Sequence, residues 1–338
     1  MKPLVRRVVL VVALGVVLGA ASPPAWAGKP QPPAPQPDPA IVFRDIVNGA
    51  NPAYYLRVMN ADGTNIRAVL GPEGNPVFWQ PSWSPDAQWI VFAATYAAFP
   101  ASHPELNAIG PGIYMIDLAA TTLCQVTPLR NGKPVDAGPA WSPGPVPGWG
   151  PAKIVYSDDS DVPGDRDLYF VDPTCGAAPV NVTRTADMLE YSATWGPGQT
   201  RLAAPASGPT GDSLLVFDVQ APLLSLAMDL GVPAGMGYAP RYPDWSPDGH
   251  AIAFSDVTFF PSDLWLYSFE LPGFVRLTDT AEVNEHWPAW APDSARIVFA
   301  TFGGVSQIYV MDAQPGALRR PLTSGRKNRY QEPDWRAF

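Results

Sequence analysis

A six-residue phrase, proline-x-tryptophan-serine-proline-aspartate, recurs along the chain and limits the folds open to it. Complete copies begin at Pro81 and Pro243, and variant or partial copies occur at four further places. The six tryptophans of these copies are 58, 54, 50, 45 and 45 residues apart, at Trp83, Trp141, Trp195, Trp245, Trp290 and Trp335. A repeat of roughly fifty residues is typical of propellers and solenoids.

The segments after each phrase keep one order. The first copy is followed by an apolar run at Trp89–Phe92, a second run ending at Asp117, and a third at Val126-Thr127. Apolar residues alternate within such runs, which is the period of a strand. The chain also has 42 prolines and 29 glycines, which break helices but suit the turns of sheets. Four short strands per repeat predict one propeller blade.

The two ends of the repeat region complement each other. Ile41–Phe43, Tyr55–Met59 and Ile66–Leu70 match the second to fourth strands of a repeat, and no tryptophan phrase precedes them. Pro333–Trp335 matches a first strand with nothing after it. We therefore expect residues 41–338 to form an all-β, six-bladed propeller with four-stranded blades. The C-terminal strand would complete the first blade and close the ring, leaving no exposed sheet edge there.

The repeat resembles that of the TolB-like (WD40-like) β-propellers. Trp245–Gly249 and Ile308–Asp312 come close to that family's pattern, and the resemblance covers Ile41–Phe338 without the additional N-terminal domain of TolB itself. It implies a periplasmic or cell-surface six-bladed propeller that acts through protein contacts.

The N-terminus has the pattern of a secretion signal. Three basic residues precede the apolar run Val8–Ala21, and Ala25-Trp26-Ala27 fits a cleavage site. The run is shorter than the roughly 20 residues of a membrane span, although an uncleaved anchor is the alternative. We expect a signal peptide at 1–27, a proline-rich linker at 28–40, a periplasmic or secreted protein, and no stable membrane span after cleavage.

Charge argues against one class of partner. The full chain has a net charge of −9, and removal of residues 1–27 leaves 19 basic and 31 acidic residues, a net charge of −12. Such a surface repels phosphate backbones, so we expect no nucleic-acid partner.

The residues just before each tryptophan phrase are candidates for binding. In a propeller these connections gather at one mouth of the central channel, and aromatics beside carboxylates are typical of recognition surfaces. We expect a monomer, without cofactor or metal, that docks a protein, peptide or cell-envelope component there. The candidates are Trp79, Gln80, Asp136, Glu190, Tyr191, Arg241, Tyr242, Glu285, His286, Trp287, Tyr330, Gln331 and Glu332.

An enzymatic alternative uses the same mouth. His286 with Glu285 and Glu190 would act as acid and base in a hydrolase or lyase. The separate hydrolase domain of propeller peptidases, with its G-x-S-x-G motif, is not found in the sequence. The binding module is the preferred interpretation.

Three further patterns have mainly structural interpretations. The tryptophans of the phrase would fill the space between blades, while its proline and aspartate form a turn. The acidic segment Asp158–Asp167 is interpreted as a solvated turn, with calcium binding as the alternative. Cys124 and Cys175 are a possible disulfide in an oxidising compartment, or else two separate small apolar residues.

Overall fold

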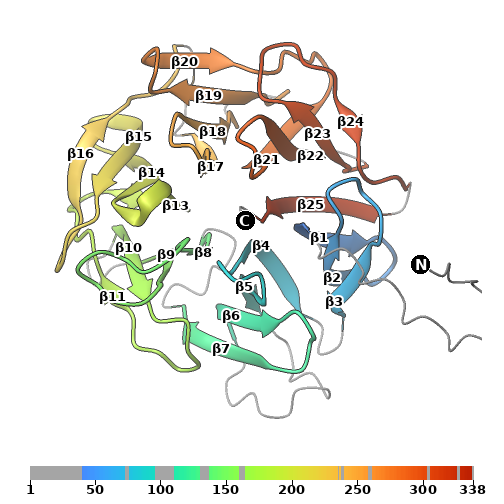
Figure 1. Ribbon diagram of the computed structural model, residues 1–338, viewed down its shortest axis with the longest axis horizontal. Coiled ribbons are helices and arrows are strands. Elements are labelled where there is room, and N and C mark those ends of the chain that lie inside the picture. Colours follow the sequence, from blue (N-terminus) through green and yellow to red (C-terminus); the bar gives the residue numbers. More distant parts are fainter. Residues whose placement is uncertain are drawn as a thin grey trace, which may run out of the picture. The chain divides into compact units, whose positions relative to one another are not determined.

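The computed structural model is built from β-sheets. It describes residues 40–72, 76–95, 110–129, 137–159, 164–234, 236, 240–257, 261–302, 305–325 and 328–336. Within these ranges the regular structure is strand, apart from the single 3₁₀ turn η2 (Pro197–Gln199). The sheets are arranged radially around a common centre, which is a β-propeller arrangement (Figure 1). The all-β propeller expected from the repeat is therefore present.

Four of the sheets have four strands each, with neighbours in chain order. The sheet that contains both ends of the repeat region is β25 (Asn328–Trp335), β1 (Ile41–Val47), β2 (Ala53–Met59) and β3 (Arg67–Leu70). The next is β4 (Val77–Trp83), β5 (Trp89–Thr95), β6 (Gly112–Asp117) and β7 (Leu123–Pro128). Two more are β17 (Arg241–Trp245), β18 (Ala251–Ser255), β19 (Leu264–Ser268) and β20 (Gly273–Arg276), and β21 (Asn284–Trp290), β22 (Arg296–Phe302), β23 (Ile308–Asp312) and β24 (Arg320–Pro321).

The remaining strands form one nine-stranded sheet, so the expectation of six separate four-stranded sheets is wrong. The cause is the two-residue strand β12, which pairs in parallel with Arg166 of β10 and antiparallel with Ser207 and Ala206 of β14. Hydrogen bonds thus continue from one repeat into the next. The strands are β8 (Ala140–Trp141), β9 (Ile154–Asp159), β10 (Arg166–Val171), β11 (Val180–Asn181), β12 (Leu189–Glu190), β13 (Thr194–Trp195), β14 (Arg201–Gly208), β15 (Gly211–Asp218) and β16 (Ser225–Asp229).

The C-terminal strand pairs with the first strand of the repeat region. β25 runs antiparallel to β1, with Trp335 opposite Ile41 and Asn328 opposite Val47. The seven residues of β1 also pair with β2 on their other side. The strand that the opening repeat lacks in sequence is therefore supplied from the opposite end of the chain.

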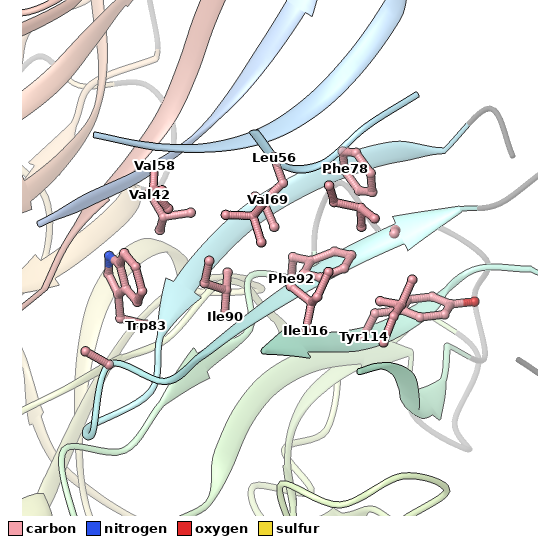
Figure 2. Close-up of a cluster of buried hydrophobic side chains, with 14 residues drawn as sticks. Val42, Leu56, Val58, Val69, Phe78, Trp83, Ile90, Phe92, Tyr114 and Ile116 are labelled. Atoms are coloured by element: carbon pink, nitrogen blue, oxygen red, sulfur yellow. The ribbon is translucent and has the colours of Figure 1, made fainter. Parts of the chain in front are cut away.

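Tryptophans of the repeat phrase pack between adjacent sheets. Trp83 is 4% exposed and lies in a cluster with Val42 and Val58 of the preceding sheet and with Ile90 and Phe92 of its own (Figure 2). Burying a large aromatic ring here removes apolar surface from water on both sheets at once. The expected role of tryptophan as a filler between blades is confirmed at this position.

The serine and aspartate of the phrase form the turn that follows the tryptophan. Ser84 Oγ donates to Asp86 Oδ1 at 2.6 Å and accepts the Trp89 N–H at 2.9 Å. Ser246 and Asp248 repeat the first of these hydrogen bonds at 2.6 Å. Because these side chains satisfy backbone groups of the hairpin, they make the tight turn expected of them.

The two cysteines form a disulfide. Cys124 of β7 and Cys175, in the turn after β10, have Cα atoms 5.7 Å apart and are joined across adjacent repeats. The bond closes a loop with a sequence separation of 51 residues.

The signal peptide and most of the linker, residues 28–39, lie outside the described residues. Among the described residues, none belongs to a helix with the length and hydropathy needed to cross a membrane.

Removal of the disulfide should destabilise the fold. Replacing both Cys124 and Cys175 by alanine should lower the free energy of unfolding by about 2–4 kcal/mol, because the unfolded chain regains the entropy of the closed loop. Denaturant unfolding of the oxidised protein, the reduced protein and the double variant measures this. Equal midpoints for all three would contradict it.

Candidate functional site

A central cavity of about 350 Å³ is lined by the tryptophan phrase of every repeat. The contributing strands are β25, β4, β8, β13, β17 and β21, and each contacts the next in a cycle that returns to β25. Each strand, together with the residues just before it in β8 and β13, supplies the residue before proline, the proline position itself, the variable residue and the tryptophan. The six variable residues are Ser82, Ala140, Thr194, Asp244, Ala289 and Asp334.

A β-bulge precedes the tryptophan in four of the six strands, β4, β17, β21 and β25. The pairing register shifts by one residue between Trp79 and Ser82, and again at the same place in β17 and β21. The bulged residues that precede proline have positive φ, at 47° for Gln80 and 54° for Tyr242. Such a conformation costs roughly 1–2 kcal/mol for a residue other than glycine, and bulges that re-aim side chains are frequent at functional sites.

The equivalent residues of all six repeats line the cavity, and we call this set the bulge ring. Four of its members are side chains that were candidates from the sequence. The ring consists of Gln80, Gly138, Ser192, Tyr242, Trp287 and Glu332.

One side of the bulge ring is polar and internally hydrogen-bonded. The Gln80 side chain donates to Ser192 Oγ at 2.9 Å and accepts the Gly138 N–H at 2.9 Å. Its backbone N–H donates to Glu332 Oε2 at 2.8 Å, and Arg44 of β1 lies 3.0 Å from Glu332 Oε1. This network fixes four members of the ring in position.

The other side of the bulge ring is aromatic. The rings of Tyr242 and Trp287 lie 5.4 Å apart between centroids, and Phe302 lies 5.9 Å from Trp287. The bulge ring therefore has hydrogen-bonded polar groups on one side and two aromatic side chains on the other.

Two aspartates occupy the variable position of the phrase, two residues after members of the bulge ring. Asp244 Oδ2 accepts the Trp290 N–H at 2.6 Å, and Asp334 Oδ2 accepts the Trp83 N–H at 2.9 Å. Desolvation raises the pKa of Asp244 to about 6. Desolvation, with the nearby Asp244 as a second cause, raises the pKa of Asp334 to about 8. Both aspartates line the cavity.

The structure separates the sequence-predicted candidates into two groups. Gln80, Tyr242, Trp287 and Glu332 line the cavity, while Asp136 lies outside the described residues. The remaining candidates are not among the lining residues: Trp79, Glu190, Tyr191, Arg241, Glu285, His286, Tyr330 and Gln331.

The carboxylates that were expected at an open rim are buried. Glu190 is 0% exposed and binds Thr183, Thr185 and the Leu168 N–H, and desolvation raises its pKa to about 7. Glu285 is also 0% exposed and pairs with Arg319. Both satisfy groups within their own part of the fold, so neither forms an acidic mouth.

His286 is likewise an internal residue. It is 9% exposed, and its Nε2 lies 2.6 Å from Ser262 Oγ. Burial lowers its pKa to about 4, so the imidazole is neutral near pH 7.

The acidic segment 158–167 is described only in part, because residues 160–163 lie outside the described ranges. Asp167 accepts hydrogen bonds from Asn181, Thr183 and Thr185. Among the described residues, no three His, Cys, Asp or Glu side chains are grouped in a way that could hold a metal ion.

Sequence reasoning missed Asp244 and Asp334 as cavity residues. Both stand at the variable position of the phrase, where the other repeats have Ser82, Ala140 and Ala289, with Thr194 in the degenerate repeat. A comparison of that one position across the repeats would have shown that only these two repeats have an acidic residue there.

Gly138 should be essential to the bulge ring. A Cβ at this position would lie 2.0 Å from Ser192 Oγ and 2.7 Å from its Cα, so Gly138→Ala should cost roughly 3 kcal/mol. Gly150→Ala is the matched control, because Gly150 also has positive φ but no atom within 4 Å, and should cost about 1 kcal/mol. Thermal unfolding measures both, and equal losses would argue against the close approach.

Asp334 should make stability depend on pH. Its pKa is raised from 3.8 to about 8, so the folded state holds a proton that the unfolded chain releases, and stability falls as pH rises through that interval. Asp334→Asn should remove part of this fall. From pH 6 to pH 8 the Tm of the parent protein should therefore drop by roughly 2–5 °C more than the Tm of the variant. Asp187→Asn, at an exposed residue, is the control. Parallel pH profiles for Asp334→Asn and the parent protein would contradict the assignment.

Comparison with solved structures identifies proteins of similar fold. TolB from Acinetobacter baumannii is 18% identical with a TM-score of 0.64, and the match covers 88% of this chain and 66% of that one. The chain thus spans just under two thirds of that TolB. Hydrazine synthase of Kuenenia stuttgartiensis matches at 11% identity and a TM-score of 0.63, over 88% of this chain and 46% of that one. The periplasmic gluconolactonase PpgL of Pseudomonas aeruginosa matches at 13% identity and 0.51, over 83% and 82%.

No protein-family model and no curated protein matches the sequence. The structural neighbours differ in what they do, and at these identities they define architecture alone. The chain has a TolB-like β-propeller fold.

Proposed function

We propose that this chain is an exported, non-catalytic binding propeller that takes a segment of a protein, peptide or cell-envelope component into its central cavity. The observation that carries the proposal is the bulge ring. Residues from separate repeats, four of them non-glycine residues with positive φ, line a single cavity, and one side of it is polar while the other is aromatic. Concave sites with aromatic walls and a few fixed polar groups are typical of ligand binding.

The proposal includes a six-bladed closed ring. In this interpretation the nine-stranded sheet comprises two blades, β8 to β11 and β13 to β16, which β12 joins by hydrogen bonds. The cycle of contacts among the six first strands supports that count, as does the pairing of β25 with β1. A closed ring would hold the cavity rigid without further partners.

Export to the periplasm is part of the same proposal. It rests on the signal pattern of residues 1–27 and on the disulfide between Cys124 and Cys175, a bond that persists in oxidising compartments. The name of one structural neighbour, a periplasmic gluconolactonase, agrees with this location.

A binding role is favoured over hydrolase or lyase chemistry at the channel mouth. His286, Glu285 and Glu190 are not among the cavity-lining residues, and each is hydrogen-bonded inside the fold. A general base has to come within hydrogen-bond reach of its substrate, and these three have no such access from the cavity.

Site-specific photo-crosslinking tests the proposal. A benzoylphenylalanine in place of Tyr242 should crosslink a partner when the mature protein is incubated with a cell-envelope extract, because this side chain lines the cavity. The same label in place of Leu318, which is 94% exposed and away from the cavity, is the control. Adducts at position 318 but none at position 242 would overturn a role for the cavity.

A further inference from the structure

The cavity has an unbalanced charge. Its lining includes the carboxyl groups of Asp244, Asp334 and Glu332, and none of the described residues that line it is Lys, Arg or His. Arg44 approaches Glu332 from β1 but is not a lining residue. In the described part of the chain, no salt bridge involves Asp244 or Asp334, and their recorded partners are backbone N–H groups and the Thr194 hydroxyl. Two acids therefore face the cavity without a counter-ion.

Two of the tryptophans that line the cavity carry a buried hydrogen-bond donor without an acceptor among the described residues. The indole nitrogens of Trp83 and Trp287 have no hydrogen-bond partner among the described residues, although the two side chains are only 4% and 8% exposed. Both residues line the cavity. A buried N–H left unpaired costs about 1–3 kcal/mol, so these donors indicate that an occupant brings acceptor atoms.

The aromatic side of the bulge ring adds a third requirement. Tyr242 and Trp287 are adjacent in the ring, and the electron-rich faces of such rings attract ammonium and guanidinium groups. Carboxyl groups and aromatic faces together favour a cation over a neutral ligand. Unpaired indole donors also favour a cation that is attached to carbonyl groups, as it is in a peptide.

We propose that the cavity binds an organic cation, the lysine or arginine side chain of an inserted peptide segment, between the carboxyls of Asp244 and Asp334 and the rings of Tyr242 and Trp287. This inference rests on the proposed binding function and names its ligand chemistry. Backbone carbonyls of the segment accept from the two tryptophan indoles.

Proton release is a consequence of this arrangement. A bound cation favours the ionised form of Asp244 and Asp334, whose pKa values desolvation raises in its absence to about 6 and about 8. Binding therefore expels protons, and affinity rises with pH between these values. Glu332 is the other acidic side chain among the described lining residues, and it pairs with Arg44, which is not a lining residue. Thr194 donates a hydrogen bond to Asp244.

Calorimetry with defined probes tests the inference. The probe is the blocked tripeptide acetyl-Ala-Lys-Ala-amide, and its isosteric control has norleucine in place of lysine. The protein without residues 1–27 should bind the lysine peptide about tenfold more tightly than the norleucine peptide at pH 8. This difference in affinity should shrink at pH 5.5. Equal affinity for the two peptides at pH 8 would overturn the proposal.

Variants assign the binding to the two acids. The double variant Asp244→Asn with Asp334→Asn should lose about tenfold in affinity for the lysine peptide together with its pH dependence, whereas the exposed Asp187→Asn should bind as the parent does. Parent-like binding by a folded double variant would contradict the assignment. Butylamine distinguishes the source of the cation: weaker binding than the lysine peptide supports a peptide segment, and equal binding overturns that part.

The two proposals fail separately. Persistent photo-crosslinking at position 242 in the double asparagine variant would leave the partner-binding function in place and overturn the cation chemistry. Specific binding of the lysine peptide, without any crosslink at position 242 from cell-envelope extracts, would support the cation chemistry and overturn the partner-binding function.

Discussion

The bulge in the first strand of four repeats, in β25, β4, β17 and β21, is the constraint on which the site depends. In a regular strand, neighbouring side chains alternate between the two sheet-to-sheet interfaces, and the core would take most of them. The extra residue interrupts that alternation at Gln80, Tyr242, Trp287 and Glu332, and φ becomes positive at each of them. The proline that follows has no N–H to leave unpaired. In these four repeats the residue before proline thereby becomes one of the residues that line the shared cavity.

The same short phrase also holds adjacent sheets together. Asp334 accepts the Trp83 N–H of the following sheet, Asp244 accepts the Trp290 N–H, and Thr194 accepts the Trp245 N–H at 3.1 Å. The variable residue therefore links each of these first strands to the next repeat while its side chain lines the cavity. Where it is an aspartate, burial disfavours the ionised form and raises the pKa. In our proposal a positively charged occupant offsets this desolvation free energy. Structure and recognition use the same side chains.

The fold could be predicted from the sequence because the residues of the repeat phrase form their turn through hydrogen bonds with each other and with nearby backbone groups. Tryptophan, serine and aspartate make the wedge and the turn wherever they occur, so strand positions and the pairing of β25 with β1 follow from the pattern. β12 was not readable, because a two-residue pairing to Arg166 and Ala206 depends on tertiary approach and not on propensity. Glu190 and His286 had the composition of a rim but are buried by neighbours that sequence reasoning could not place. Asp244 and Asp334 were overlooked because they lie inside a phrase whose structural role explained it fully.

The arrangement of all these residues requires that β25 be paired within the first sheet, and native-state hydrogen exchange measures that pairing directly. The backbone amides of 328–335 should exchange as slowly as those of β1 and β2, since strands of one hydrogen-bonded sheet open together. Fast exchange across β25 while β1 and β2 stay protected would mean that the C-terminal strand is not part of the sheet, and the shared cavity would lose one of its six walls.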